Sequence, residues 1–97
     1  MQFTQKRYEE NHREEIELEK MRKSINERIN ALNENSTIKD VAEIESSIEV
    51  YSDICKDVEG YRPRTEIGSF HTKMKEKTPA FEEFWNLDFE ERYKLFN

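Results

Sequence analysis

Residues that could bind a metal ion occur near the N-terminus, where Glu9, His12 and Glu15 follow one another at helical spacing. The Glu-x-x-His motif supplies carboxylate and imidazole ligands to the di-iron sites of helical bundles, but those sites use the motif twice. This sequence contains it once, and the second histidine, His71, lies among lysines. We therefore expect no metal site, and we interpret both histidines as solvated surface residues.

Signatures of catalysis are missing from the sequence, which has no P-loop, no Gly-x-Ser-x-Gly, no zinc-protease motif and no dinucleotide fingerprint. Cys55 is the lone cysteine, and two histidines distant from it in the sequence are weak support for a thiol nucleophile. The many carboxylates alternate with lysines and arginines as they do on solvated helix faces. We expect a protein that binds another macromolecule, without enzymatic activity and without a cofactor.

The most distinctive stretch is YSDICKDVEGYRPR, residues 51–64. In one interpretation it is structural: Gly60 permits a turn after a helix, and Tyr61 packs back on the last helical turn. One or the other of two aspartates could then hold one or the other of two arginines in a bidentate pair. These residues are Asp53, Asp57, Arg62 and Arg64.

The alternative interpretation of the same stretch is functional. Arg62 and Arg64, stiffened by Pro63 between them, would present guanidinium groups to an acidic or phosphate-bearing partner. Both interpretations can hold together, because a rigid turn displays its arginines in a fixed direction.

Residues 51–64 also resemble a pattern found in short, uncharacterised proteins of tailed bacteriophages. In that pattern a helix ends Y-S-D-x-x-K-D-V-x-G and continues aromatic-R-P-R. The resemblance implies an accessory protein of host takeover or counter-defence, such as an anti-CRISPR or anti-restriction protein. Such a protein would act in the cytoplasm of an infected bacterium by binding and inhibiting or redirecting a host defence or transcription protein.

We expect the partner to be bound by the turn at residues 60–64 together with neighbouring aromatic side chains. The candidate contact residues are Tyr51, Asp53, Lys56, Asp57, Tyr61, Arg62, Arg64, Phe84 and Trp85.

The composition favours long, solvated helices over a thick globular core. Of the 97 residues, 34% are hydrophobic and 39% are charged, so the apolar share is lower and the charged share higher than in an average globular domain. Two Gly and two Pro are too few for the turns of a multi-stranded sheet. A chain of this length should form one small domain.

The net charge of -6 argues against a generally basic nucleic-acid binder and points towards a protein partner. The single cysteine fits a reducing compartment. No apolar run approaches the ~20 residues that span a bilayer. We therefore expect a cytoplasmic protein without a membrane span.

A first helix is predicted over residues 3–34. Thr4 is the expected N-cap, and Phe3 and Tyr8 would pack across it as a hydrophobic staple. The apolar residues of this helix recur three or four positions apart and so share one stripe. They are Leu18, Met21, Ile25, Ile29 and Leu32.

A second helix is predicted over residues 37–59, where Thr37 and Asp40 resemble a capping box. Its seam alternates steps of three and four, the spacing that keeps one face against a partner helix. The seam residues are Val41, Ile44, Ile48, Tyr51, Cys55 and Val58. Joined by a short turn at residues 33–36, the two helices should fold back as an antiparallel hairpin. The shorter second helix would cover the first back only to about His12.

Residues 60–77 are predicted to be a basic connecting loop, because their pattern is irregular and includes Pro63 and Gly68. A short extended piece is expected at residues 65–70.

Residues 78–97 are predicted to be helical and carry most of the large apolar area of the protein. Thr78 can cap this segment, and Pro79 is tolerated at its first helical position. A break at residues 86–88 would divide it into two short helices. We expect its aromatic rings to cover the hairpin, while a tail that packs only partly would leave a patch for a partner.

The sequence thus predicts an all-α single domain over residues 1–97. It consists of an antiparallel, coiled-coil-like two-helix hairpin, a basic loop, and a short aromatic-rich C-terminal helix or pair of helices.

Three alternatives to a protein inhibitor remain open. Nucleic acid could bind the connector, with phosphate contacts that weaken as salt rises; the residues would be Arg62, Arg64, Lys73, Lys75 and Lys77. An acidic helix face could mimic a nucleic-acid backbone, through Glu43, Glu45, Glu49 and Asp53. The uncovered start of the first helix could instead form a homodimer or a larger assembly.

Overall fold

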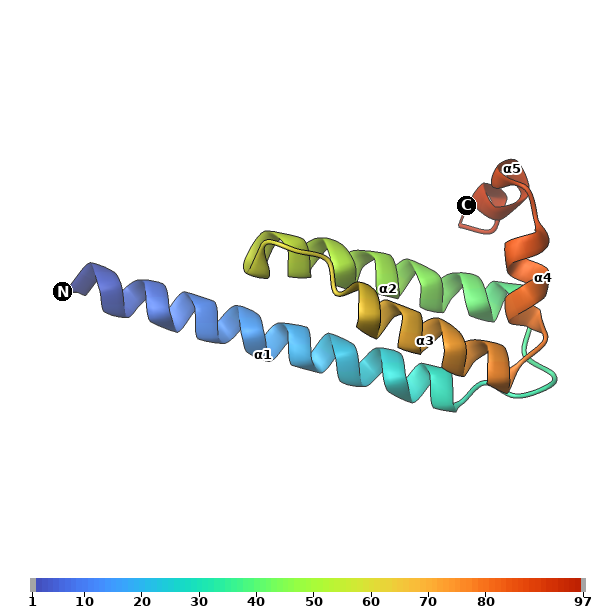
Figure 1. The fold of residues 1–97 in the computed structure, drawn as a ribbon, viewed down its shortest axis with the longest axis horizontal. Helices are drawn as coiled ribbons and strands as arrows, with labels where there is room; N and C mark the ends of the chain where they lie inside the picture. The colour runs from blue at the N-terminus through green and yellow to red at the C-terminus, as the bar shows by residue number, and fades with distance from the viewer. Residues whose placement is uncertain (1, 97) are drawn as a thin grey trace.

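The computed structural model describes the backbone of residues 2–96 and the side chains of residues 13–96. Over residues 2–96 the fold is all-α, with five helices and no strand. The helices are α1 (Gln2–Asn30), α2 (Ile38–Glu59), α3 (Arg64–Lys77), α4 (Ala80–Asn86) and α5 (Phe89–Lys94). Figure 1 shows α1 and α2 as an antiparallel hairpin with α3 lying along both, so the predicted hairpin is confirmed.

The turn between α1 and α2 is built from side chains that bond to nearby backbone groups. Asn33 Oδ1 accepts the N–H of Asn35 at 2.7 Å, and Ser36 Oγ accepts the N–H of Asn33 at 2.9 Å. Asn and Ser side chains of this kind compete with helical hydrogen bonds. For this reason α1 ends at Asn30, short of the predicted end at residue 34.

The N-terminus of α2 has the predicted capping box. Thr37 Oγ1 accepts the N–H of Asp40 at 3.2 Å, and Asp40 Oδ2 accepts the N–H of Thr37 at 2.9 Å. Two backbone donors that have no partner within the helix are thereby satisfied. The start of α2 is fixed by residues adjacent in sequence, which is why the sequence located it.

The core lies between the predicted stripes of α1 and α2 and is completed by α3 and α4. All the α1 stripe residues except Met21 are buried, and so are all the α2 seam residues except Val58; those two are half-buried against the core. α3 and α4 contribute four further buried apolar side chains, which are Phe70, Met74, Ala80 and Phe84.

The hairpin is asymmetric, as the helix lengths predict. Figure 1 shows the N-terminal part of α1 continuing well past the end of α2, and the molecule measures 54 × 27 × 22 Å. The predicted N-cap at Thr4 is wrong, because the helix already includes Gln2. The proposed staple of Phe3 and Tyr8 lies outside the described side chains.

The prediction of a loop over residues 60–77 is wrong for most of that range, because α3 occupies Arg64–Lys77. The expected extended piece at 65–70 is helical too. Ile67, Phe70 and Met74 fall on one face and pack into the core formed by α1 and α2. Half of the residues of α3 are good helix formers, and the spacing of these three apolar residues is helical, so Pro63 and Gly68 were misleading as signs of a loop.

The end of α2 is the predicted left-handed glycine. Gly60 has φ 86°, and its N–H donates to the Lys56 carbonyl at 2.9 Å. A positive φ of this size is strained for residues with a Cβ. The expected packing of Tyr61 onto the last helical turn is wrong, since 62% of that side chain is exposed.

Candidate functional site

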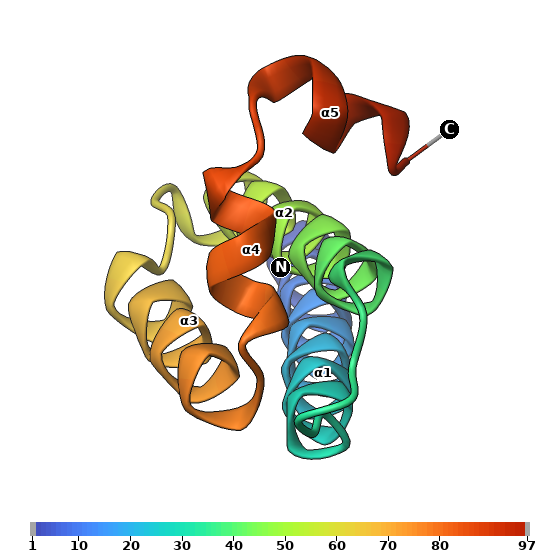
Figure 2. The ribbon, with the colours of Figure 1, turned by 90° about the vertical axis from the view of Figure 1, so that its right-hand side faces the viewer.

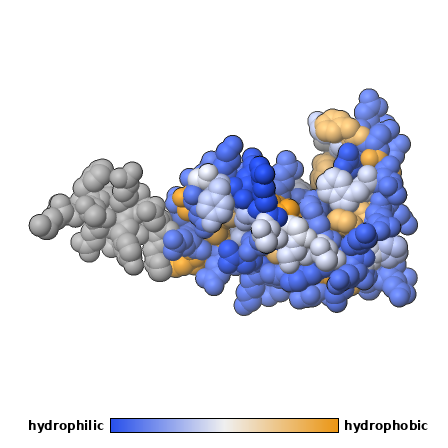
Figure 3. All heavy atoms as spheres, in the orientation of Figure 1, coloured by the Kyte–Doolittle hydropathy of each residue, from blue (hydrophilic) through white to orange (hydrophobic). Residues whose placement is uncertain are grey.

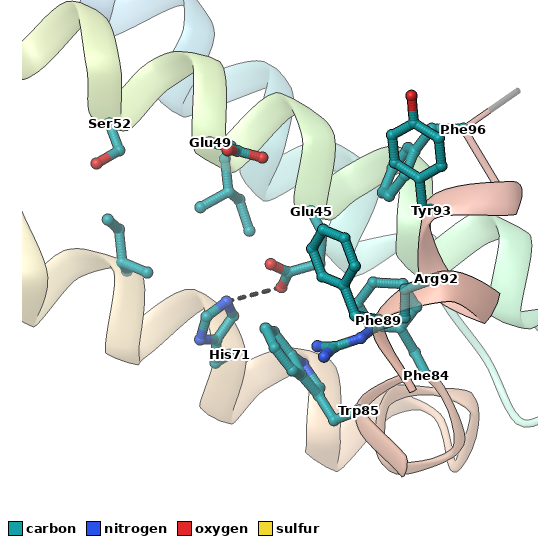
Figure 4. Close-up of a pocket in the computed structure, with 12 residues that line it drawn as sticks. Glu45, Glu49, Ser52, His71, Phe84, Trp85, Phe89, Arg92, Tyr93 and Phe96 are labelled. Carbon is teal, nitrogen blue, oxygen red and sulfur yellow. Dashed lines mark ion pairs between the residues drawn. The ribbon is translucent and has the colours of Figure 1, made fainter. Parts of the chain in front are cut away.

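An apolar groove of about 610 Å³, open to solvent, lies between α2, α3 and the C-terminal part of the chain. We call it the aromatic groove and define it by the residues that line it. One wall is α2, with Glu45, Ile48, Glu49 and Ser52; the floor is α3, with Ile67 and His71. The other wall is the C-terminal part of the chain, with Phe84, Trp85, Phe89, Arg92, Tyr93 and Phe96. Figure 4 shows these side chains converging from the separate helices.

The C-terminal wall is positioned by caps that the sequence indicates. Thr78 ends α3 by donating its N–H to the Met74 carbonyl, and its Oγ1 accepts the N–H of Ala80 at 3.2 Å. Pro79 adopts helical dihedral angles at the start of α4, as predicted. Thr78 therefore turns the chain from α3 directly into α4, which crosses the end of the body near the α1–α2 turn (Figure 2).

The predicted break at residues 86–88 is confirmed and produces a separate α5. Asp88 caps this helix, with its Oδ1 accepting the N–H of Glu91 at 2.8 Å. Figure 2 shows α5 standing off from the body that the other helices form. None of the α5 residues is buried, although Leu95 just after it packs partly against the core. The groove is the space that this displaced helix leaves beside α2.

The aromatic side chains of α5, and that of Phe96 just after it, are exposed to solvent. The exposed fractions are 76% for Phe89, 61% for Tyr93 and 49% for Phe96, and the rings of Phe89 and Tyr93 stack with centroids 6.4 Å apart. Figure 3 shows hydrophobic side chains gathered around the recess beside α5, on a face that is otherwise largely hydrophilic. The tail therefore covers the hairpin through α4 and leaves an apolar patch at α5.

Polar groups lie at the bottom of the groove without well-aligned hydrogen bonds. His71 Nε2 lies 2.7 Å from Glu45 Oε1, a contact that is an ion pair only when the imidazole is protonated. The alignment of these two atoms does not meet hydrogen-bond geometry, and the buried Arg92 Nε has no hydrogen-bond partner among the described residues. These three atoms come from α2, α3 and α5, so the groove brings polar groups of three helices together.

Two polar side chains of the groove, Arg92 and His71, lie against aromatic rings. The guanidinium carbon of Arg92 lies 5.1 Å from the centroid of the Trp85 ring, within cation–π range. The His71 ring lies 5.6 Å from Phe81 and 5.8 Å from Trp85, centroid to centroid. Trp85 of α4 thus contacts side chains of both α3 and α5.

The predicted site at the 60–64 turn is in part a structural contact. Arg62 Nη1 donates to Asp53 Oδ1 at 2.6 Å and to Ser52 Oγ at 3.0 Å, so the pairing of an arginine with an aspartate is confirmed for this pair. The remaining candidates at this end are exposed side chains without an ion pair among the described residues. They are Lys56, Asp57, Tyr61 and Arg64.

The structure separates the two parts of the predicted contact surface. The 60–64 turn follows the end of α2, whereas α4, which carries Phe84 and Trp85, lies near the start of α2 (Figure 1). Ser52 lines the aromatic groove and also accepts the hydrogen bond from Arg62. The groove therefore extends towards the turn but does not include it.

Two of the predicted contact residues are buried. Phe84 is 3% exposed and packs beside Trp85, and Tyr51 has no exposed surface. Both act as core residues in this structure: Tyr51 offers no area to a partner, and Phe84 offers only the small part of its surface that borders the aromatic groove. The sequence placed Tyr51 on the buried seam of α2, and the structure supports that assignment over the contact role.

Tyr51 links three helices through its hydroxyl group. The hydroxyl donates to a Glu66 carboxylate oxygen on α3 and accepts from Arg22 Nε on α1 at 3.1 Å. Arg22 Nε also lies 2.9 Å from the other carboxylate oxygen of Glu66. Burial, together with the hydrogen bond to Glu66, raises the pKa of Tyr51 far above its usual value.

The only cysteine is inaccessible to reagents in solution. Cys55 is 1% exposed, and burial raises the pKa of its thiol. A buried, protonated thiol is a poor nucleophile at neutral pH.

Among the described side chains no group of three or more His, Cys, Asp and Glu residues is arranged to hold a metal ion. Glu9 and His12 lie outside those side chains. Of the described helices, none combines the length and apolar character needed to cross a bilayer.

The basic residues predicted as a nucleic-acid surface are divided by the helical geometry of α3. Residues two apart on a helix point to nearly opposite sides, so Lys75 faces away from Lys73 and Lys77. Lys75 is further engaged with Glu82, 3.4 Å away on α4. Of the four acidic residues proposed as a nucleic-acid mimic, Asp53 is paired with Arg62, and Glu45 lies against His71.

Several residues of the groove were not among the contact residues predicted from the sequence; they include Phe89, Tyr93, Phe96, His71 and Arg92. The signal for Phe89, Tyr93 and Phe96 was present in their spacing of four and three after a helix-capping Asp88. No local signal could have paired His71 with Glu45, because their contact depends on how α3 packs on α2.

Comparison with known proteins finds no match: no protein family fits the chain, and no characterised protein or solved structure is detectably similar to it. The fold and the groove therefore define the class by themselves. The class is a small helical bundle with an aromatic groove open to solvent.

Proposed function

We propose that this protein acts by binding a protein partner, and that the aromatic groove holds an apolar segment of that partner. The observation that carries the proposal is the exposure of Phe89, Tyr93 and Phe96 around one groove, in a chain with only 34% hydrophobic residues. Exposed apolar patches on small proteins mark interaction sites. Trp and Tyr, both present here, are enriched among the residues that dominate binding energy.

Covering the exposed aromatic rings would contribute a useful share of the free energy of binding. Covering each of the three partly exposed rings contributes on the order of 1 to 2 kcal/mol. Trp85, which is 44% exposed in the same groove, adds to this. Their sum offsets a substantial part of the ~4–15 kcal/mol of rotational and translational freedom lost on association.

The resemblance of residues 51–64 to tailed-bacteriophage proteins supports a bacterial host protein as the partner, inhibited or redirected during infection. A defence protein, such as a CRISPR or restriction component, or a part of the transcription machinery fits that resemblance. The groove would then occupy a surface that the host protein uses for its own contacts.

The test compares two surfaces of the same chain. One variant removes groove area by Phe89→Ser and Phe96→Ser, and a second removes the turn candidates by Tyr61→Ser and Arg64→Ser. All four side chains are exposed, so both variants should keep the helicity of the unmodified chain by circular dichroism.

Tagged chains are used to capture proteins from bacterial lysate, and each captured protein is then purified and titrated by calorimetry. We expect a protein whose binding is lost with the groove variant and kept with the turn variant. The converse pattern would assign binding to the 60–64 turn. Equal binding to both variants and the unmodified chain would refute a role for the groove.

A further inference from the structure

We propose that the occupant of the aromatic groove is a cationic amphipathic helix of the partner, with a lysine or arginine placed at Glu49. This inference rests on the proposed function and specifies the chemistry of the partner. Four properties of the groove support it: the spacing of the lining residues, the helical backbone of the walls, the exposure of the groove to solvent, and the charge of its lining.

The α2 wall of the groove has helical periodicity. Its lining residues follow at i, i+3, i+4 and i+7, from Glu45 to Ser52, which spans about 10 Å at 1.5 Å per residue. The aromatic residues opposite are Phe89 and Tyr93 of α5 and Phe96 just after it, and α5 runs across the direction of α2 (Figure 2). A helix packed along the α2 wall would present side chains at i, i+3 or i+4, and i+7, as helices do in apolar grooves, and the aromatic side chains would close over it.

The backbone of the walls does not favour an extended partner. Residues 2–96 contain no strand, so this part of the chain offers no sheet edge to which a peptide strand could add. The few polar side chains of the groove could satisfy little of an extended backbone. A helix satisfies its own backbone groups and needs only apolar contacts from the groove.

The groove is also too open for a small molecule to be its natural occupant. Pockets for small ligands cover about 70–90% of the ligand surface. Here one side is open, and Phe89 and Tyr93 remain largely exposed at the rim. An occupant that covers both rims must be elongated and must lie along the groove.

The charge of the groove favours a cationic occupant. Glu49 lines the α2 wall, is exposed, and has no ion-pair partner among the described residues. The lining also includes Glu45 and Arg92, so it carries two carboxylates against one guanidinium, and that guanidinium is held over the Trp85 ring. A second copy of this chain, with its net charge of -6, would meet like charge there, which disfavours self-association through the groove.

The experiment uses the purified chain and synthetic peptides that contain no tryptophan. The first peptide is an amphipathic helix with leucines at i, i+3, i+4 and i+7 and flanking lysines. The second has glutamates in place of the lysines, and the third is the cationic peptide with a central proline. Binding is followed by the emission of Trp85, the single tryptophan of the chain, which shifts to shorter wavelength as the groove is covered.

We expect the cationic helix to bind about tenfold more tightly than the acidic one. The central proline should weaken binding by about a hundredfold, because it breaks the helix. With Glu49→Lys the preference should reverse, and the acidic peptide should become the tighter ligand. The matched control is Glu43→Lys, which adds the same charge on α2 outside the aromatic groove and should leave the preference for the cationic peptide in place.

Equal affinity for the cationic and acidic peptides would overturn the charge part of the inference, as would a preference unchanged by Glu49→Lys. Equal affinity for the proline peptide would overturn the helical part. If no peptide binds, the inference as a whole is wrong. The capture experiment with the groove and turn variants would still decide the proposed function, because it requires neither a helical nor a cationic partner.

Discussion

At the scale of single residues, Tyr51 shows how one polar group can organise an apolar core. Its ring has no exposed surface, yet its hydroxyl joins Arg22 of α1 to Glu66 of α3. The two charged partners face the surface and are partly solvated. The network is therefore a satisfied hydrogen-bond triad at the edge of the core, which fixes the register of three helices against one another.

Replacing Tyr51→Phe should lower the free energy of unfolding by about 1 to 2 kcal/mol at neutral pH, because two hydrogen bonds are lost while the ring is kept. The effect should also depend on pH. Above pH ~10 the unfolded chain loses the phenolic proton, whereas the folded chain, with the raised pKa of Tyr51, retains it. The stabilisation is complete below the unfolded pKa and is lost as the pH rises from there through the folded pKa.

Urea unfolding at about pH 8 and about pH 11 measures this difference, and the unmodified chain should lose about 1 kcal/mol more than Tyr51→Phe over that interval. Tyr61→Phe, at an exposed tyrosine, is the control and should behave as the unmodified chain. If all three proteins lose the same free energy of unfolding between the two pH values, the folded state does not hold the phenolic proton of Tyr51.

Cys55 provides a second prediction at this scale. Because the thiol is buried and its pKa is raised, its reaction with Ellman's reagent should require opening of the fold. A thiol moved to the exposed position of Val50 on the same helix, by Cys55→Ala with Val50→Cys, should react at least about a hundredfold faster. Similar rates would mean that α2 opens readily around Cys55.

At the scale of elements, replacing each of the two glycines of the chain by alanine should change stability in opposite directions. Gly60 has φ 86°, whereas Gly68 lies inside α3, and an added Cβ would meet no atom within 4 Å at either position. Gly60→Ala should therefore destabilise by about 1 kcal/mol through backbone strain alone. Gly68→Ala should stabilise by about 0.5 to 1 kcal/mol by favouring the helix. Thermal melts of the two variants measure both effects, and equal signs would contradict a left-handed Gly60 and a helical Gly68.

The displacement of α5 leads to a further prediction. A chain ending at Leu87 loses α5, which has no buried residue, and loses Leu95, which packs only partly against the core. Its free energy of unfolding should fall by no more than about 2 kcal/mol, and its helical body should remain folded. The peptide titration should then show no binding, because one wall of the aromatic groove is gone. An unfolded truncated chain would instead make α5 part of the core.

At the scale of the whole molecule, stability and binding use separate apolar surfaces. Ile29→Ala removes a fully buried side chain between the helices and should cost about 2 to 5 kcal/mol. Phe89→Ala removes a side chain that is 76% exposed and should change stability by about 0.5 kcal/mol or less. Urea unfolding of both variants tests this separation, which fails if the two losses are similar.

The sequence by itself determined the features that depend on neighbouring residues. Thr37 with Asp40, Gly60, Thr78 with Pro79, and the break before Asp88 all act through hydrogen bonds or backbone angles within a few positions. The α1 and α2 stripes were readable as well, because helical periodicity places their apolar residues on one face whatever they pack against.

The tertiary structure decided what distant segments do to one another. α3 packs on α1 and α2 through Phe70 and Met74, which are buried, and Ile67, which is partly buried, and this packing stabilises the helix across Gly68. The helical spacing of α2 places the Tyr51 ring on the seam, but its hydroxyl is satisfied only because Arg22 of α1 and Glu66 of α3 converge on it. The aromatic groove exists because α4 crosses the end of the bundle and holds α5 away from α2, and the spacing of Phe89, Tyr93 and Phe96 alone could not tell a covered face from an open one.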